Sequence, residues 1–278
     1  MSFNINNSSV CDVAVIMSVY RSDDPTFLKD AIDSVLNQTV PCKVFLCRDG
    51  IVDSPLQKVI DQYLEYEMVV GLLLDENKGL ASSLNSLIDL VVKEEFKYVA
   101  RMDSDDISRN ERFFKQIKFL QENPDISVCG TFCREFGATY ALEKKGLPVA
   151  HTELIDFSIY RCPFIHPSVM FKMDIFKKGY RYPTNTKLTE DMALWFELLV
   201  DGFKFGNVNE VLLDYRLTEN TIERRKGVSK AWSEFFIRSR YMFKLKMVTL
   251  NNIAKITSRL IFHILPSSLV KLAYKKLR

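Results

Sequence analysis

The stretch YVARMDSDDISRNERF, residues 98–113, places an acidic run directly after an apolar run that is typical of a buried strand. The acidic run contains Asp103, Ser104, Asp105 and Asp106. Neighbouring carboxylates repel one another, and each loses hydration when it is partly buried. A bound divalent cation would remove both costs, so the run indicates a metal site at the end of a strand. A turn that caps the next helix is the alternative, because Asp and Ser are also favoured there.

The segments around this run alternate between strand and helix patterns. Continuous apolar runs predict strands at 13–20, 42–50, 68–75 and 97–102, and amphipathic runs predict helices at 25–36, 54–66 and 77–92. After the acidic run, Ser108 and Glu111 predict a capping box for a helix that continues to Leu120. The alternation predicts an α/β fold with a Rossmann-like, mostly parallel sheet flanked by helices.

Polar stretches follow each predicted strand. The carboxyl ends of parallel strands meet at one edge of a sheet, and ligands bind there. We therefore expect four stretches to converge: Tyr20–Asp24, Arg48–Gly50, Asn77–Gly79 and Asp103–Asp106. This convergence, more than any single motif, makes the acidic run a candidate functional site.

The charge of the chain is unevenly distributed. The 278 residues carry a net charge of +3, but residues 221–278 hold 14 of the 38 Lys and Arg residues and only two acids, which gives +12 there and −9 in residues 1–220. The sequence shows neither a secretion signal nor an apolar run of about 20 residues, and its six cysteines lack a pairing rhythm. These features predict a cytoplasmic protein with reduced thiols and a basic tail that binds an anionic partner.

Five stretches, read in order, resemble the inverting glycosyltransferases of family two, which have the GT-A fold: VAVIMSVYRSDDPTFLKDAIDSVLNQT, LCRDG, NKGLASSLN, RMDSDD and TEDMALWFELLVDGFKFGNVNEVLLDYRL. The resemblance covers roughly residues 12–220. It implies a catalytic domain at 1–220, with a nucleotide-sugar half at about 12–130 and an acceptor half at about 131–220. A basic amphipathic helical tail at 221–278 would follow.

The resemblance assigns roles to residues near the predicted sheet edge. It implies that Asp105 binds Mn²⁺ or Mg²⁺, and that Asp103 contacts the metal or the ribose. Asp49 matches the residue that contacts the uracil, although Arg48 stands where the family usually has another acid. Tyr20 is placed to stack on the base, with an unliganded rim tyrosine as the alternative.

Further candidates for donor binding are basic. Lys78 matches a position near the nucleotide phosphates, although a solvated loop lysine would also explain it. Arg224 and Arg225 could fold over the pyrophosphate because guanidinium groups bind phosphate in a bidentate manner, and a solvated charge run is the alternative. Tyr215 and Arg216 match a Tyr-Arg pair that is common in the family.

Residues 189–202 predict a helix with Glu190 and Asp191 in its first turn. The favourable interaction of a negative charge with a helix N-terminus would explain one of these two acids. The resemblance implies that Asp191 is the general base that deprotonates the acceptor hydroxyl, and that Glu190 supports it. His166 is a structural or acceptor-site residue, with metal ligation as a further alternative.

The basic tail has apolar residues at helical spacing around Pro266, namely Ile253, Ile256, Leu260, Ile264, Leu269 and Leu272. Basic amphipathic helices lie on anionic membranes, so we expect peripheral attachment to the inner face of the bacterial inner membrane. Packing against the catalytic domain or a second subunit is the alternative.

Within the family, the acidic run and residues 147–171 resemble enzymes that add a β1,3-linked hexose to N-acetylhexosamine diphosphoundecaprenol. This implies transfer of galactose or glucose from UDP, with inversion, to undecaprenyl-diphosphate-linked GlcNAc or GalNAc during O-antigen synthesis. A sugar-phosphate nucleotidyltransferase is one alternative, but SVYRSDDP is not a Gly-rich phosphate loop. A non-catalytic binder of an anionic polymer is another. The tail has few aromatic residues, so no nucleic-acid partner is expected.

Overall fold

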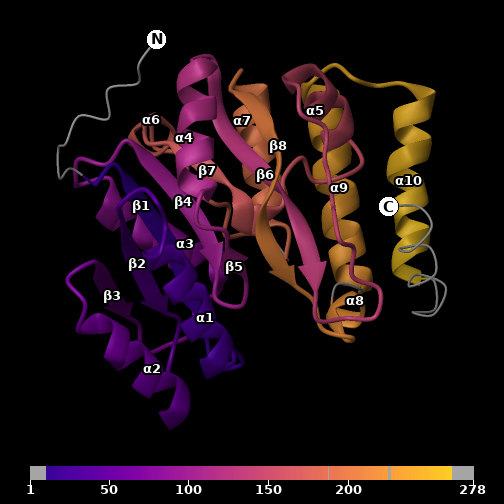
Figure 1. The fold of residues 1–278 in the computed structure, drawn as a ribbon. Coiled ribbons are helices and arrows are strands. Elements are labelled where there is room, and N and C mark those ends of the chain that lie inside the picture. Colours follow the sequence, from indigo (N-terminus) through magenta and orange to yellow (C-terminus); the bar gives the residue numbers. More distant parts are fainter. Residues whose placement is uncertain (1–10, 187, 225–226, 265–278) are drawn as a thin grey trace.

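The computed structural model describes residues 11–186, 188–224 and 227–264. In this part of the chain, eight strands form a single sheet with the order β3-β2-β1-β4-β7-β6-β8-β5, and helices cover it (Figure 1). The fold is mixed α/β and has the Rossmann-like first half that the sequence predicts.

The first half of the sheet is parallel. Its strands are β1 (Val13–Val19), β2 (Cys42–Arg48), β3 (Val69–Leu73) and β4 (Tyr98–Asp103). Three helices connect them: α1 (Pro25–Leu36), α2 (Ser54–Leu64) and α3 (Leu80–Val91). All seven elements match the predicted ones within a few residues.

The second half combines parallel and antiparallel pairs. It comprises β5 (Ile107–Ser108), α4 (Arg112–Glu122), β6 (Ile126–Phe136), α5 (His151–Ser158), the 3₁₀ helix η1 (His166–Ser168), β7 (Met170–Lys172), α6 (Asp174–Lys177), α7 (Glu190–Val200) and β8 (Lys204–Arg216). Strand β7 is antiparallel to both β4 and β6, and β8 is parallel to β6. Strands β4, β6 and β8 therefore end at the same edge of the sheet.

The core has a layer on each face of the sheet. Val13, Val15 and Met17 of β1 pack with α1 and α2 on one face, and Ala14 and Ile16 pack with α3 on the other. Successive strand residues point to opposite faces, so a strand covered on both sides needs an apolar residue at every position. This requirement explains the continuous apolar run in the sequence.

The predicted capping box at Ser108 is wrong. Ser108 lies on β5, and α4 begins at Arg112 without a side-chain cap from its own N-terminal residue. The side chain of Gln38 serves instead, because its Oε1 accepts the Phe113 N–H at 3.1 Å while its Nε2 donates to Ser108 Oγ at 3.2 Å. A distant side chain thus satisfies the helix start, which local spacing cannot reveal.

Three helices follow the sheet: α8 (Thr221–Arg224), α9 (Val228–Lys244) and α10 (Leu250–Ile264). Helix α9 packs on the body, where Tyr241 stacks on Phe196 of α7 with ring centroids 5.0 Å apart. Helix α10 packs against α9, and its Ile256 is buried with the main core (Figure 1). The described part of the tail is helical as predicted, and Ile256 is buried in the protein instead of being free to contact a membrane.

The described helices include none that is both long enough and apolar enough to cross a bilayer. The predicted apolar positions Leu269 and Leu272, together with Pro266, lie outside the described residues.

We expect Ile256→Ala to lower the free energy of unfolding by about 2 kcal/mol, because truncating a buried isoleucine leaves a cavity in the core. Ile253→Ala on the same helix is the matched control, since Ile253 is 43% exposed. That variant should change the free energy by no more than about 0.5 kcal/mol. Urea unfolding measures both values. Equal effects would mean that α10 does not pack on the protein as described.

Candidate active site

The acidic run forms a cluster of three carboxylates at the end of β4. Asp103, Asp105 and Asp106 each offer an oxygen, and these oxygens lie within 4.8 Å of one another. Asp103 and Asp105 are partly accessible, whereas Asp106 is fully buried. Hard divalent cations prefer such oxygen ligands, so the cluster fits Mg²⁺ or Mn²⁺. Both predicted metal ligands belong to it, and Asp106 is an addition.

A buried arginine on the same strand supports the cluster. Arg101 is 2% exposed and forms an ion pair with Asp103. The two residues lie two positions apart on β4 and so point to the same face of the sheet. Sequence reasoning missed Arg101, although a charged residue inside an apolar strand pattern must find a partner when it is buried. That requirement was the available signal.

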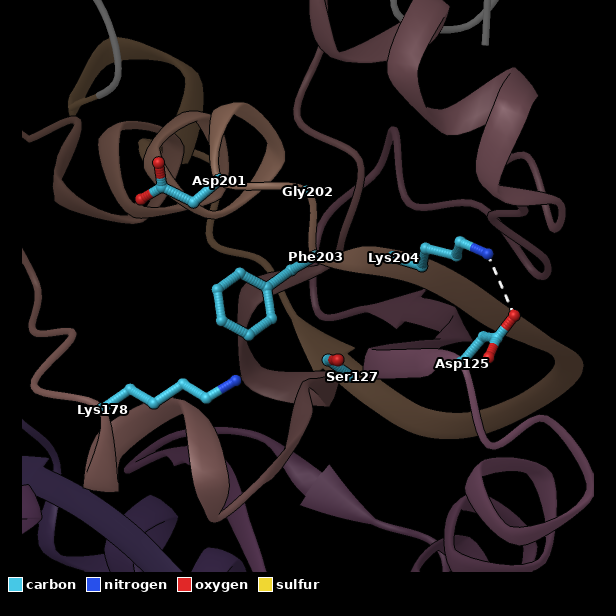
Figure 2. Close-up of a pocket in the computed structure, with 7 residues that line it drawn as sticks. All are labelled: Asp125, Ser127, Lys178, Asp201, Gly202, Phe203 and Lys204. Atoms are coloured by element: carbon cyan, nitrogen blue, oxygen red, sulfur yellow. Dashed lines mark hydrogen bonds and ion pairs between the residues drawn. The ribbon is translucent and has the colours of Figure 1, made fainter.

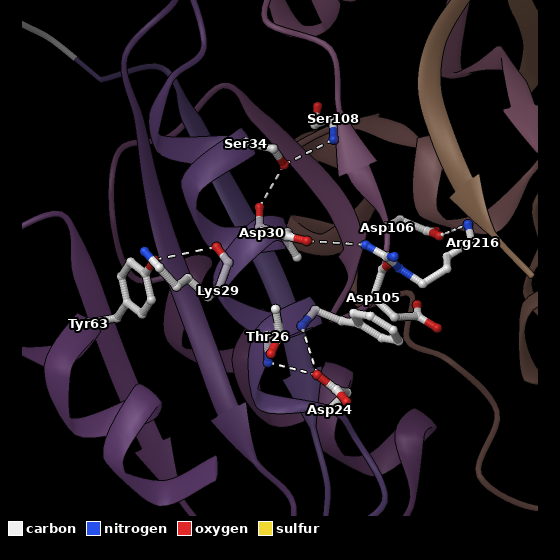
Figure 3. Close-up of polar contacts among 12 residues, drawn as sticks. Asp24, Thr26, Lys29, Asp30, Ser34, Tyr63, Asp105, Asp106, Ser108 and Arg216 are labelled. Atoms are coloured by element: carbon white, nitrogen blue, oxygen red, sulfur yellow. Dashed lines mark hydrogen bonds and ion pairs between the residues drawn. The ribbon is translucent and has the colours of Figure 1, made fainter. Parts of the chain in front are cut away.

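Arg216, the last residue of β8, holds the acidic run from the other side (Figure 3). Its backbone N–H donates to Asp106 Oδ1 at 2.7 Å, and its Nε donates to the Asp105 carbonyl oxygen at 2.7 Å. The guanidinium lies 3.8 Å from the ring centre of Phe27 and also bonds Asp30 of α1 at 3.3 Å. Arg216 therefore fixes both the backbone and one carboxylate of the cluster.

The first loop is tied to the same cluster. Asp23 Oδ2 accepts the Ser104 hydroxyl at 2.8 Å and the Tyr20 N–H at 3.0 Å. The loop after β1 and the acidic run after β4 therefore lie side by side. This contact confirms the predicted convergence of these two stretches.

The environment raises the pKa of two of the carboxyls. Burial raises the pKa of Asp105 to about 7, and the charges of Asp103 and Asp23 act in the same direction. Burial and the neighbouring carboxylates also raise the pKa of Asp106 well above its ordinary value. Without a cation, the folded protein therefore carries acids that resist ionisation.

A pocket of about 410 Å³ opens at the ends of the first three strands. Its lining residues come from three of the predicted polar stretches: Tyr20, Arg21, Ser22, Gly50, Ile51 and Asn77. Tyr20 is 39% exposed at its edge, which leaves its ring accessible to a flat ligand. The pocket adjoins the acidic run through the Tyr20–Asp23 loop, so a ligand could extend from the pocket to the three clustered carboxylates.

Asp49 stabilises the loop that contributes Asn77 to this pocket. It is 3% exposed, and its two carboxylate oxygens accept the backbone N–H groups of Lys78 at 2.7 Å and Gly79 at 3.0 Å. Gly50 has φ 87°, and a Cβ there would lie 2.8 Å from the Asn77 nitrogen. The structure thus gives Asp49 a role in shaping the loop, and its contact with a base stays a proposal.

The basic candidates are placed differently from one another. The side chain of Lys78 is exposed, next to the pocket. Arg48 faces away from the pocket, because its guanidinium donates to Gln57 Oε1 at 2.8 Å and to the Leu74 carbonyl at 3.2 Å. Arg224 ends α8, where only its backbone is described, and Arg225 lies outside the described residues.

Glu190 and Asp191 lie in the first turn of α7. Helix α7 is joined to the start of β8 by residues 201–203, so the two acids are at the end of the helix that is remote from that connection. Asp191 Oδ1 accepts the Met192 N–H at 2.7 Å, and burial raises its pKa, opposed by that hydrogen bond and by Lys230. Burial and the charge of Asp191 raise the pKa of Glu190.

Arg101 connects the two acidic groups electrostatically. Burial is the main cause of the raised pKa of Asp105, Glu190 and Asp191. The positive charge of Arg101 lowers the pKa of all three acids and so opposes this rise. A single buried guanidinium therefore lies close enough to influence both.

His166 is half-buried and packs against aromatic side chains. Its Nε2 lies 3.0 Å from the Tyr182 hydroxyl, and its ring contacts Trp195 with centroids 6.1 Å apart. Burial holds the pKa of His166 well below its ordinary range, so the imidazole is neutral. The structural interpretation of His166 is favoured over metal ligation, and Trp195 is a core residue at 1% exposed.

A second hollow, of about 280 Å³, lies at the opposite edge of the sheet (Figure 2). Its lining comes from the region before β6, the end of α6 and the start of β8, and Asp125 pairs with Lys204 across it at 3.0 Å. This hollow is remote from the acidic run, and none of the predicted site residues lines it.

Comparison with known proteins gives a consistent result. The profile of the family described as Glycosyl transferase family 2 matches residues 14–180. The chain is 33% identical over 269 residues to UDP-Gal:alpha-D-GlcNAc-diphosphoundecaprenol beta-1,3-galactosyltransferase of Escherichia coli, and the match covers 95% of each chain.

Solved structures share the fold at low sequence identity. The chain matches TarS residues 1–349 of S. aureus in complex with UDP-GlcNAc with TM-score 0.65 and 16% identity, over 90% of this chain and 71% of that one. It matches a mannosyltransferase of Pyrobaculum calidifontis in complex with GDP-Man and Mn²⁺ with TM-score 0.59 and 12% identity, over 95% and 84%. These likenesses support the GT-A assignment of the fold.

We expect Arg216→Lys to lower the affinity for Mn²⁺ in nucleotide binding about tenfold or more. The variant keeps the backbone bond to Asp106, but one ammonium cannot bond both the Asp105 carbonyl oxygen and Asp30 as the guanidinium does. Titration of UDP at several Mn²⁺ concentrations measures the effect. Arg109→Lys is the matched control, since Arg109 contacts Asp214 at 2.9 Å and none of the three clustered carboxylates in the described structure. An unchanged Mn²⁺ dependence in Arg216→Lys would contradict the role given to this residue.

We expect the metal-free protein to lose stability as the pH rises from about 4 to about 7. In this window folded Asp105 keeps a proton that the unfolded chain, with the ordinary pKa of 3.8, releases, so unfolding becomes more favourable with rising pH. Asp105→Asn cannot ionise there and should gain about 1 kcal/mol or more over the wild type between about pH 5 and pH 8.

Urea unfolding in the presence of a chelator measures this difference. Added Mn²⁺ should restore the stability of the wild type at high pH and should leave the stability of Asp105→Asn unchanged. A difference between the two proteins that stays constant with pH would show that Asp105 titrates normally.

Proposed function

We propose two substrates for this chain, which belongs to glycosyl transferase family 2. The donor is a UDP-hexose, and the acceptor is an N-acetylhexosamine joined through a diphosphate to undecaprenol. The hexose is galactose or glucose, and the product is a β1,3-linked disaccharide made with inversion. The E. coli relative, named for this type of transfer, supports the choice and favours galactose. Products of this kind serve the synthesis of bacterial surface polysaccharide such as O-antigen.

One arrangement carries the proposal. The carboxylates of Asp103, Asp105 and Asp106 lie beside the pocket at Tyr20, and the charge of the buried Arg101 influences both this group and the Glu190–Asp191 pair. The first group suits a metal-bound diphosphate, and the second supplies acids of raised pKa for proton transfer. A nucleotidyltransferase or a non-catalytic binder does not require the second group, and family membership favours glycosyl transfer over both.

The pocket receives the nucleotide in this proposal. The accessible ring of Tyr20 stacks on the uracil, and Asp49 holds the loop of Lys78 against it. Asp105 and Asp103 would hold Mn²⁺ or Mg²⁺, and the bound ion would supply positive charge to the diphosphate of the UDP leaving group. Arg224 and Arg225 follow β8 in sequence, and their guanidinium groups would bind the pyrophosphate.

Asp191 acts as the general base. It accepts the proton of the acceptor hydroxyl as that oxygen attacks the anomeric carbon, while the bond to UDP breaks on the opposite face. One displacement inverts the centre and needs no covalent enzyme intermediate. The raised pKa of Asp191 makes the carboxylate a stronger base, and Glu190 beside it orients the acceptor.

The acceptor is a lipid, so the enzyme works at the inner face of the bacterial inner membrane in this proposal. Residues 221–278 with their charge of +12 would bind the anionic surface. The catalytic region remains residues 1–220, with its nucleotide-sugar half at about 12–130 and its acceptor half at about 131–220.

The test is transfer of labelled hexose from a panel of UDP-sugars to a synthetic GlcNAc- or GalNAc-diphospho-lipid, with and without Mn²⁺. Galactose or glucose should appear on the lipid, and UDP should be released. Formation of a UDP-sugar from a nucleoside triphosphate and a sugar phosphate would identify a nucleotidyltransferase instead.

We expect Asp191→Asn to lower the transfer rate about a hundredfold or more, because the amide cannot accept the acceptor proton. Affinity for UDP with Mn²⁺ should remain near that of the wild type. Glu197→Gln on the same helix is the control, since Glu197 interacts with Tyr241 and not with the sheet edge. Near-normal transfer by Asp191→Asn would show that another group is the base.

A further inference from the structure

Helix α9 exposes a row of large apolar side chains, which we call the α9 stripe: Val228, Trp232, Phe236 and Phe243. Their exposed fractions are 67%, 48%, 64% and 65%. The spacings of four, four and seven residues place them on one side of the helix. The rings of Trp232 and Phe236 lie 5.8 Å apart, so the middle of the stripe is an aromatic surface. Exposed apolar surface of this kind marks an interaction site.

The opposite side of α9 is anchored firmly. Arg238 is 1% exposed and donates to the Ser158 carbonyl oxygen at 2.7 Å, and Tyr241 and Met242 are buried in the core. The helix cannot turn its aromatic side inward without breaking these contacts. Exposure of the stripe is therefore a property of the packed protein and does not reflect a loose helix end.

The stripe lies beside the candidate base. The Ser233 hydroxyl is 3.0 Å from the Thr189 hydroxyl, and Thr189 directly precedes Glu190 and Asp191. Ser233 follows Trp232 in the sequence, so the aromatic surface begins one residue from the contact that joins α9 to the start of α7. Whatever binds the stripe is held next to the side of the cleft that receives the acceptor.

The charges around the stripe indicate its partner. Arg240 and Lys244 are exposed on the same helix, near Phe236 and Phe243, and the whole segment 221–278 carries +12. Trp and Phe side chains bordered by Lys and Arg are typical of helices that lie in the interface of anionic bilayers. A second copy of this chain would bring exposed Arg240 and Lys244 near their own equivalents, which disfavours a dimer through this surface.

We propose that the α9 stripe inserts into the headgroup region of an anionic bilayer and thereby sets the acceptor side of the cleft at the membrane surface. The inference rests on the proposed function for its lipid-linked acceptor. It differs from attachment by the basic charge alone, because aromatic burial at α9 fixes the orientation of the protein as well as its presence at the membrane.

The test uses the full-length double variant Trp232→Ser/Phe236→Ser and vesicles of phosphatidylglycerol and phosphatidylethanolamine. Vesicle co-sedimentation should fall about tenfold or more relative to the wild type, because two aromatic side chains lose their burial in the interface. Phe114→Ser is the matched control, since Phe114 is an exposed aromatic on α4 at 43% and lies outside the stripe. It should bind vesicles as the wild type does.

Two transfer assays separate the membrane step from chemistry. The double variant should transfer hexose to a short-chain, water-soluble acceptor diphosphate at the wild-type rate, which also shows that it is folded. Its transfer to the long-chain acceptor embedded in vesicles should fall about tenfold, as binding does. Failure of the wild type with every UDP-hexose and the soluble acceptor would overturn the proposed function, while vesicle binding would still test the stripe.

Several results would overturn the inference. One is vesicle binding by the double variant equal to that of the wild type. Another is a concentration-dependent dimer of the wild type that the double variant abolishes while vesicle binding is unaffected, since the stripe would then be an interface between copies. A third is equal transfer by both proteins to the embedded acceptor.

Discussion

The crowding of three carboxylates at the end of β4 is the constraint on which the site depends. One carboxylate oxygen each of Asp103, Asp105 and Asp106 lies within 4.8 Å of the others, and burial raises the pKa of Asp105 and of Asp106. A fold that keeps them together must hold their backbone in place and supply positive charge. Arg101 supplies a buried cation on one side, and Arg216 supplies backbone and side-chain donors on the other. The native arrangement is thus prepared for a cation at some expense of stability without one, as is common at functional sites.

The two halves of the sheet contribute different parts of this arrangement. The parallel half brings the ends of β1, β2 and β3 together around the pocket at Tyr20, with Asp49 holding the loop of Asn77 and Lys78. The mixed half brings in Arg216 from β8 and the start of α7. Because β6 and β8 run in the same direction as β4, parts of the chain about 100 residues apart in sequence meet at one edge.

The C-terminal helices connect this cleft with the proposed surroundings of the enzyme. Helix α9 contacts the start of α7 through Ser233 and presents the α9 stripe outward, while Glu234 pairs with Arg259 of α10 at 3.0 Å. The basic composition of this segment alone would permit loose electrostatic attachment to a membrane. Its packing adds a defined orientation, because an anchored helix can present only one side. In the proposed function, the hydrogen bond between Thr189 and Ser233 links the start of α7 to the helix that would face the lipid acceptor.

The sequence alone determined the strands and helices of the first half, since apolar runs and helical spacing are local signals. It also located the acidic run, the Glu190–Asp191 pair and the helical tail. The cap of α4 could not be predicted, because Gln38 reaches it from another part of the chain. The same reason hid the roles of Arg101 and Arg216, whose partners depend on which strands are neighbours.

The tertiary structure also decided which side of each C-terminal helix faces the solvent. Helical periodicity in the tail identified Ile256 as apolar but gave no partner, and folding buries it while leaving Trp232 and Phe236 exposed. The spacing of apolar residues within one segment indicates which side chains must be buried. The surface that buries them comes from elements that are distant in the chain. The local sequence therefore determined which apolar and charged side chains each segment has. The packing of segments distant in the chain determined which of these side chains contact one another.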